Sequence, residues 1–232
     1  MTTLGIIGGI APPSTIDYYQ RLTARYRERS PDGSYPSIVI DSIDAQAFFV
    51  LLRAGDRSRM TEVLLTELGR LARAGADVGL FASNSPHAGF NEVSARSPIP
   101  LISIVEAAAD DAAARGYTRL GLLGAGFTMN GGFYPEVFAR RGMTVVVPEP
   151  DDRAWVDQRY FSEFVEGVFL EETRAGIAAV IDRMQTRDQI EAVILGGTEL
   201  PLLFRDAAAA TSVPMLDTTA IHVDAAIERL LA

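Results

Sequence analysis

The sequence contains no cysteine and no lysine, and all 21 of its basic residues are arginine. Without cysteine there is no thiolate nucleophile or base, no zinc knuckle and no disulfide framework. Without lysine there is no imine of the pyridoxal-phosphate or aldolase kind and no P-loop NTPase. Since His87 and His222 are the only histidines, a catalytic metal would depend on carboxylates. We therefore expect no cofactor and no metal site.

The chain is also poor in positive charge and in long apolar runs. Its formal net charge is −9, and an acidic excess repels polyanions, so a nucleic-acid partner is not expected. No apolar run reaches the roughly 18 residues of a membrane span, and no basic segment precedes an apolar stretch at the N-terminus. We expect a cytoplasmic protein that acts on a small molecule and has no membrane partner.

Short apolar runs rich in β-branched residues alternate with helical patterns along the chain. Strands and helices that alternate so regularly are typical of an α/β protein with parallel sheets. The predicted strands are Leu4–Ile7, Ser37–Ile43, Val78–Ala82, Leu101–Ile104, Leu120–Leu123, Met143–Val147, Ala192–Leu195 and Val213–Leu216.

The order of these segments repeats at a nearly constant offset. Gly8 after the first run corresponds to Gly124, 116 residues later, and Ser83 corresponds to Gly197, 114 residues later. The repeat predicts two structurally similar halves, each with four strands, whose strand C-termini face one crevice where open α/β sheets place ligands. The break falls near Gly116, and Pro98 and Pro100 are equally plausible boundary residues.

A glycine-rich turn follows the first strand. Paired glycines in Gly8–Thr15 allow backbone N–H groups to turn inward, and Ser14 or Thr15 could cap the next helix, whose positive end attracts anions. An ordinary capped turn would look the same. The analogous turn Gly124–Thr128 in the second half favours a functional role.

A competing interpretation treats Gly121–Gly126 as a dinucleotide-binding fingerprint. Its spacing is GxxGxG and not GxGxxG, and Glu149 lies too far along the chain to hold a ribose. A nicotinamide or flavin enzyme is therefore disfavoured.

Polar side chains follow the third strand. Ser83, Asn84 and Ser85 stand before Pro86, and together they could form a cradle of hydrogen-bond donors for a carboxylate. Helix capping alone would explain one of these residues but not all three. His87 is expected on the first helical turn, where a structural hydrogen bond and a catalytic role are both open.

Two further polar segments lie in the second half. Thr198 follows Gly197 and could cap a helix, while Glu199 is either a first-turn charge or a buried carboxylate. Asp217 or Thr218 could cap the last helix, within which His222 would be shielded from solvent.

Most arginines are expected on solvated helix faces. Arg53 is the exception that we consider functionally: if its segment folds over the crevice, its guanidinium could hold a substrate carboxylate through two hydrogen bonds.

Taken together, these segments resemble the aspartate/glutamate racemase family from end to end. No single motif is decisive, but the ordered set on a doubled α/β chain is specific. The motifs are Gly5–Ile10 with Ser14–Tyr19, Ser83–His87, Leu123–Gly124 with Phe127–Met129, Leu195–Glu199, and Asp217–His222.

The resemblance implies two pseudo-symmetric α/β/α domains, each with a four-stranded parallel sheet, and an active-site crevice between them. It also implies a homodimer and a final helix, Thr218–Leu231, that packs on the first domain. The predicted domains are 1–98 plus 217–232, and 99–216. The residues expected to bind substrate are Gly9, Ile10, Arg53, Asn84, Ser85, Thr128 and Thr198.

Members of this family racemise amino acids without a cofactor, using one thiolate to remove the α-proton and a second thiol on the opposite face to return one. The resemblance places these two catalytic positions at Ser83 and Gly197, so both thiols are replaced. A serine hydroxyl needs an adjacent base to react, and glycine has no side chain. The two-thiol reaction cannot operate in this chain.

We expect the substrate to be a small amino or dicarboxylic acid. Three interpretations of what the protein does with it follow. The protein could be an isomerase or related lyase in which His87, Glu199 or Asp217 replaces the thiols. It could instead be a racemase homologue that binds such an acid without turnover. Lastly, Ser83 and Gly197 could be engineered substitutions, or the chemistry could be unrelated.

Overall fold

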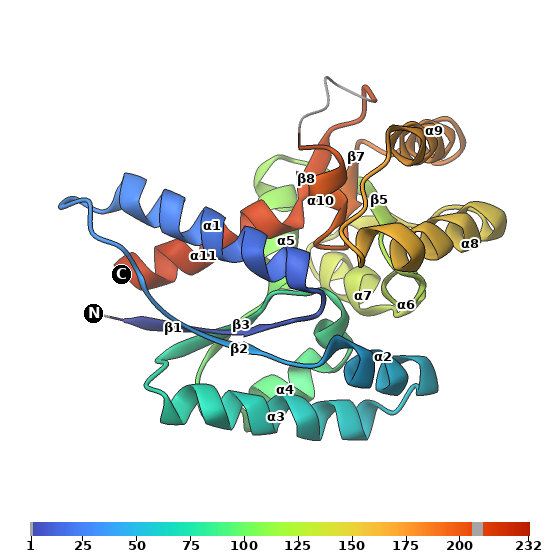
Figure 1. Ribbon diagram of the computed structural model, residues 1–232. Helices are drawn as coiled ribbons and strands as arrows, with labels where there is room; N and C mark the ends of the chain where they lie inside the picture. The colour runs from blue at the N-terminus through green and yellow to red at the C-terminus, as the bar shows by residue number, and fades with distance from the viewer. Residues whose placement is uncertain (1, 206–210) are drawn as a thin grey trace. The chain divides into compact units, whose positions relative to one another are not determined.

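A computed structural model describes residues 2–205 and 211–232. The chain forms two compact units: Met1–Ile104 with Thr219–Ala232, called unit 1, and Val105–Thr218, called unit 2. The sequence prediction divided the chain at 98/99 and 216/217. Each unit contains one four-stranded parallel sheet (Figure 1).

The sheet of unit 1 has the strand order β2-β1-β3-β4. Its strands are β1 (Thr3–Gly8), β2 (Ser37–Ser42), β3 (Val78–Phe81) and β4 (Leu101–Ile102). Its helical segments are α1 (Pro12–Arg29), α2 (Ala45–Ala54), α3 (Arg57–Arg73), the 3₁₀ turn η1 (Ser85–Gly89) and α4 (Phe90–Arg96), together with nearly all of α11 (Thr218–Leu231).

Apolar helix faces cover both sides of this sheet. Helices α1 and α11 lie on one side, where Tyr18, Leu22 and Ile227 pack against Leu4 and Leu80 (Figure 1). Helix α3 covers the other side, so closely that a Cβ at Gly5 would lie 3.1 Å from Cδ1 of Leu71. Strands buried on both faces explain the continuous apolar runs in the sequence.

The sheet of unit 2 repeats the same order, as β6-β5-β7-β8. Its strands are β5 (Arg119–Leu123), β6 (Thr144–Val146), β7 (Ala192–Leu195) and β8 (Met215–Asp217). The helical segments are α5 (Ile104–Ala114), α6 (Gly126–Asn130), α7 (Phe133–Ala139), α8 (Pro150–Arg159), the π-helical turn η2 (Tyr160–Phe164), α9 (Glu171–Asp188) and α10 (Leu200–Leu203).

The core of unit 2 forms where β5 and β7 meet α8, η2 and α9. Leu123 and Val193 of the strands contact a cluster that includes Val156, Phe164 and Ile181, all fully buried. Val156 of α8 and Phe164 of η2 therefore pack this segment against the sheet.

The predicted α/β class, the eight strands and the four-plus-four division are confirmed, but most of the strands begin or end one or two residues away from the predicted bounds. Ile104 begins α5 instead of ending a strand, and Asp217 lies in β8, where it pairs with Leu195. Within residues 2–205 and 211–232, no helix combines the length and apolar character needed to cross a bilayer.

Candidate functional site

The carboxyl end of β3 places the predicted cluster Ser83–Ser85 in a buried position. The hydroxyls of Ser83 and Ser85 lie 3.2 Å apart and share a hydrogen bond, and Asn84 is buried beside them. Asn84 precedes η1 but makes no capping hydrogen bond with its side chain. Capping therefore does not account for these three polar residues.

His87 is buried on η1 and is held by backbone and aromatic contacts. Its Nε2 accepts a hydrogen bond of 3.2 Å from the backbone N–H of Ile104, and its ring stacks on Phe90 with centroids 5.0 Å apart. Burial, and secondarily the nearby His222, lowers the pKa of His87 to about 3. The imidazole is neutral near pH 7, and the lone pair of Nε2 is already engaged.

His222 on α11 is fully buried, as predicted. Its Nδ1 accepts from the Tyr18 hydroxyl at 2.8 Å, so its Nε2 carries the proton and donates to the Ile102 carbonyl at 3.0 Å. Burial lowers the pKa of His222 to about 4. Both nitrogens are satisfied, which favours a structural role.

The first glycine-rich turn is organised differently from the prediction. Neither Ser14 nor Thr15 caps α1, whose N-cap is Ala11 without a side-chain hydrogen bond. Instead the Thr15 hydroxyl reaches back and accepts the N–H of Gly9 at 2.8 Å. Gly9 has a φ of +88°, and a Cβ there would lie 2.8 Å from the backbone nitrogen of Ile43, so only glycine fits.

The remaining predicted residues of unit 1 are Ile10 and Arg53. Ile10 is buried beside the turn. Arg53 is exposed in the last turn of α2, where a cation is favourable at the negative end of the helix. Its role as a carboxylate clamp stays a prediction.

At the carboxyl end of β7, Gly197, Thr198 and Glu199 occupy the corresponding position in unit 2. The Thr198 hydroxyl donates to Glu199 Oε2 at 3.2 Å, and the Tyr160 hydroxyl of η2 donates to the same oxygen. Both Thr198 and Glu199 are at most 2% exposed, so Glu199 is a buried carboxylate. The predicted cap by Thr198 is wrong, because its hydroxyl donates to Glu199 and α10 has no side-chain cap.

The second glycine-rich turn already holds a carboxylate of the chain itself. The backbone N–H of Gly126, at the start of α6, donates to Asp157 Oδ1 of α8 at 2.5 Å. Thr128 is buried in the same turn. An acidic side chain thus lies where the sequence predicted that a substrate carboxylate would bind.

Asp217 and Thr218 join β8 to the last helix. Strand pairing with Leu195 fixes the backbone of Asp217, and the Thr218 hydroxyl donates to the Leu195 carbonyl at 2.7 Å. This hydrogen bond ties the start of α11 to the residue two positions before Gly197.

Sequence reasoning missed Tyr160 and Asp157, the two residues of α8 and η2 that reach these positions. Their partners lie 39 and 31 residues away along the chain, and no local pattern joins them. The available signal was Gly197 itself, because a glycine in place of a larger side chain often allows another group to approach closely.

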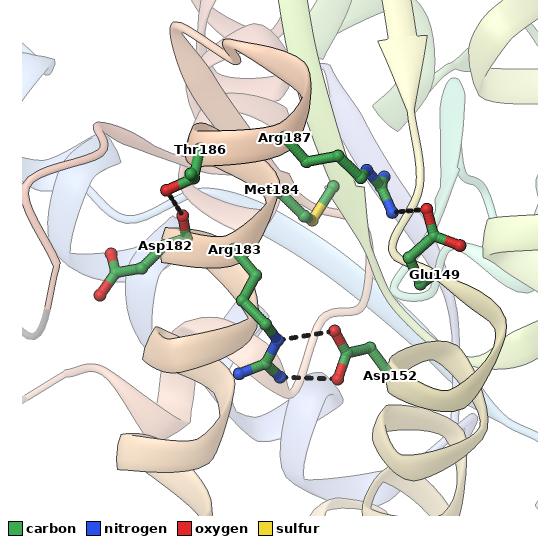
Figure 2. A pocket seen from close by; sticks show the side chains of 7 residues that line it. All are labelled: Glu149, Asp152, Asp182, Arg183, Met184, Thr186 and Arg187. Atoms are coloured by element: carbon green, nitrogen blue, oxygen red, sulfur yellow. Dashed lines mark hydrogen bonds and ion pairs between the residues drawn. The ribbon is translucent and has the colours of Figure 1, made fainter.

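Two surface cavities lie apart from the predicted site residues. In unit 2, a cavity of about 440 Å³ lies between α8 and α9, and its Arg183 and Arg187 are paired with Asp152 and Glu149 (Figure 2). In unit 1, a second cavity is lined by Thr2, Asp77, Val78, Arg229 and Ala232. None of the residues predicted to act on substrate lines either one.

Across the described ranges 2–205 and 211–232, no group of three or more His, Asp or Glu side chains is arranged to hold a metal ion. The polar groups directly after β3 and β7 include the hydroxyls of Ser83, Ser85 and Thr198, the amide of Asn84 and the carboxylate of Glu199. Such groups can bind a small ion by hydrogen bonds and can transfer protons.

Comparison with known proteins gives a consistent result. The chain matches the sequence model described as Asp/Glu/Hydantoin racemase over residues 7–226. It is 31% identical to a proposed Asp/Glu racemase from Yersinia pestis, with a TM-score of 0.88. It is 33% identical to an aspartate racemase homologue from Pyrococcus horikoshii, with a TM-score of 0.84. Both comparisons cover 100% of this chain and 100% of the other. A glutamate racemase from Francisella tularensis, solved with D-glutamate, is 15% identical, with a TM-score of 0.67 over 99% of this chain and 81% of that one.

Proposed function

Because the chain belongs to the Asp/Glu/Hydantoin racemase family, we propose that it acts on a small amino or dicarboxylic acid as a cofactor-independent isomerase or related lyase without thiols. The family supports a racemase-like function, and the D-glutamate bound by the Francisella relative supports an acid of this size. The proposed binding residues are those predicted from the sequence: Gly9, Ile10, Arg53, Asn84, Ser85, Thr128 and Thr198.

The observation that carries this proposal is the pair of buried polar clusters at equivalent strand ends. Ser83 follows β3 and Gly197 follows β7, the third strand along the chain in each unit's sheet. Around them, hydroxyl, amide and carboxylate groups remain buried although they would be better solvated in water. Polar groups kept at the carboxyl ends of parallel strands are typical of a ligand site.

The acid/base group that we propose is Glu199. It is a buried carboxylate, two residues from one of the family's two thiol positions. In unit 1, Ser83 has a hydroxyl partner and not a base, and His87 already accepts a backbone N–H. This asymmetry favours proton transfer on one face of the α-carbon, as in a lyase that protonates a carbanion, over two-sided racemisation.

A second candidate function is binding of the same acid without turnover. The pairing of Ser83 with Ser85 supports it, since a hydroxyl without a neighbouring base is a poor proton acceptor. Under this alternative, the clusters hold the acid and no bond to the α-carbon breaks.

The oligomeric state, the cellular location and the domain bounds are also part of the proposal. Family membership suggests a homodimer, which light scattering would test, and a cytoplasmic location, which fractionation of the source cells would test. The domains 1–98 plus 217–232 and 99–216, with one crevice between them, also stay predictions.

One experiment separates these candidates. Proton NMR in D₂O would follow loss of the α-hydrogen signal of aspartate and glutamate, and carboxylate loss from malonate, with wild-type protein and with Glu199→Gln. Turnover that Glu199→Gln abolishes supports the enzyme. Calorimetric binding without any turnover supports the second candidate, and the absence of both binding and turnover would contradict both.

A further inference from the structure

The space beside Gly197 is filled by the ring of Tyr160. A Cβ at residue 197 would lie 2.5 Å from Cε2 and 2.8 Å from Cζ of Tyr160, and closer still to its hydroxyl oxygen. Any side chain at position 197 would therefore overlap this ring. The tyrosine occupies the volume in which the family's second thiol would stand.

The position of Tyr160 is fixed by the π-helical turn that it begins. The backbone N–H of Val165 bonds to the carbonyl of Tyr160 at 3.0 Å, which closes the wider turn. Buried Glu163 accepts from Arg159 at 2.7 Å and from Thr173 at 2.6 Å, so this residue links the turn to α8 and α9. Such turns are frequent at functional sites.

The hydroxyl of Tyr160 has a defined hydrogen-bond direction. Burial, together with the adjacent charge of Glu199, raises the pKa of Tyr160 well above its ordinary value, so the phenol keeps its proton. The hydroxyl donates that proton to Glu199 Oε2. The same oxygen accepts a hydrogen bond from the backbone of Glu199, and its second lone pair can accept a proton from another group.

We infer that the Tyr160 hydroxyl stands in for the side chain missing at residue 197 and relays a proton between the substrate α-carbon and Glu199. The inference rests on the proposed function and adds to it the residue that touches the substrate. It also explains why glycine occupies this position, since a larger residue would displace the relay.

The relay balances in both directions. When the Cα–H bond breaks, its electron pair stays on the α-carbon, the proton moves to the Tyr160 oxygen, and the former phenol proton passes to Glu199. In the reverse direction, protonated Glu199 returns a proton to the phenol oxygen as the phenol proton forms the new Cα–H bond. In a lyase, only this second direction is needed.

The test uses the full-length protein and the D₂O assay on aspartate, glutamate and malonate. Tyr160→Phe keeps the ring but removes the relay oxygen, and should slow turnover by about 100-fold or more. The Kd for the same acid, measured by calorimetry, should change by less than about tenfold. Tyr26→Phe is the matched control, a buried tyrosine of α1 in unit 1, and should leave turnover unchanged.

A double variant tests whether the two residues act as a unit. Tyr160→Phe with Glu199→Gln should be no slower than the slower single variant, because either change breaks the same relay. Undiminished turnover by folded Tyr160→Phe would overturn the inference while leaving the proposed function intact. Absence of turnover in the wild type would instead contradict the proposed enzyme and, with it, the relay.

Discussion

The two histidines should make the protein less stable as the pH falls from neutrality to 5. Burial lowers the pKa of His87 to about 3 and that of His222 to about 4, from an ordinary value of 6.5. In the unfolded chain both imidazoles bind protons below pH 6.5, whereas in the folded chain both stay neutral until the pH is far lower. Their contribution to stability is therefore complete above pH 6.5 and is lost progressively between 6.5 and these lowered values.

The size of the effect follows from proton linkage. At pH 5, an imidazole that titrates at 6.5 when unfolded and stays neutral when folded costs about 2 kcal/mol of unfolding free energy. Two such groups cost about 4 kcal/mol, a large fraction of the 5 to 15 kcal/mol typical of folded proteins. The interval from pH 7.5 to 5 also lies above the range in which most carboxylates titrate.

Proton NMR can observe this directly, because His87 and His222 are the only histidines. Their two imidazole Cε1–H resonances should stay at fixed shifts from pH 8 to 5 in the folded protein. Urea unfolding at pH 7.5 and 5 measures the free-energy difference, and His87→Gln, which keeps an acceptor for the Ile104 N–H, should roughly halve it. A native resonance that titrates near pH 6.5 would refute the reasoning.

Three further predictions concern the packing around the strand ends. Gly197→Ala should destabilise the protein by about 1 to 3 kcal/mol, because the added methyl group overlaps with Tyr160. In a Tyr160→Leu background the same change should cost much less. Equal costs in the two backgrounds, measured by urea unfolding, would contradict the contact. Ser83→Cys with Gly197→Cys should not introduce two-thiol racemisation of aspartate or glutamate unless Tyr160→Leu makes room for the second thiol, as optical rotation would reveal. Asp157→Ala should cost about 1 to 3 kcal/mol, because the Gly126 N–H loses its carboxylate acceptor; an unchanged melting temperature would argue against that bond.

The architecture could be predicted from the sequence because its signals are local. Apolar runs and the repeat at 114 to 116 residues identified all eight strands and the two similar halves. The polar cluster Ser83–Ser85 was identified for the same reason, since it directly follows a strand. Residues that follow a buried strand are positioned by that strand.

The predictions of helix caps were wrong because each hydroxyl has more than one possible hydrogen-bond partner. Thr15 and Thr198 were expected to cap helices, but the first accepts the Gly9 N–H and the second donates to Glu199. A capping rule considers only the next helix, whereas these hydroxyls reach other groups of the folded chain. Tyr160 escaped prediction for a related reason, because its partner Glu199 lies 39 residues away.

The central claim is that the buried polar clusters at the carboxyl ends of β3 and β7 bind a small acid. Calorimetric titration of wild type and Asn84→Ala with aspartate, glutamate and malonate tests it most directly. The account predicts that at least one acid binds the wild type and that Asn84→Ala binds the same acid about 10-fold or more weakly, because a buried amide contact is lost. Equal affinity of the two proteins, or no heat of binding with any of the three acids, would contradict it.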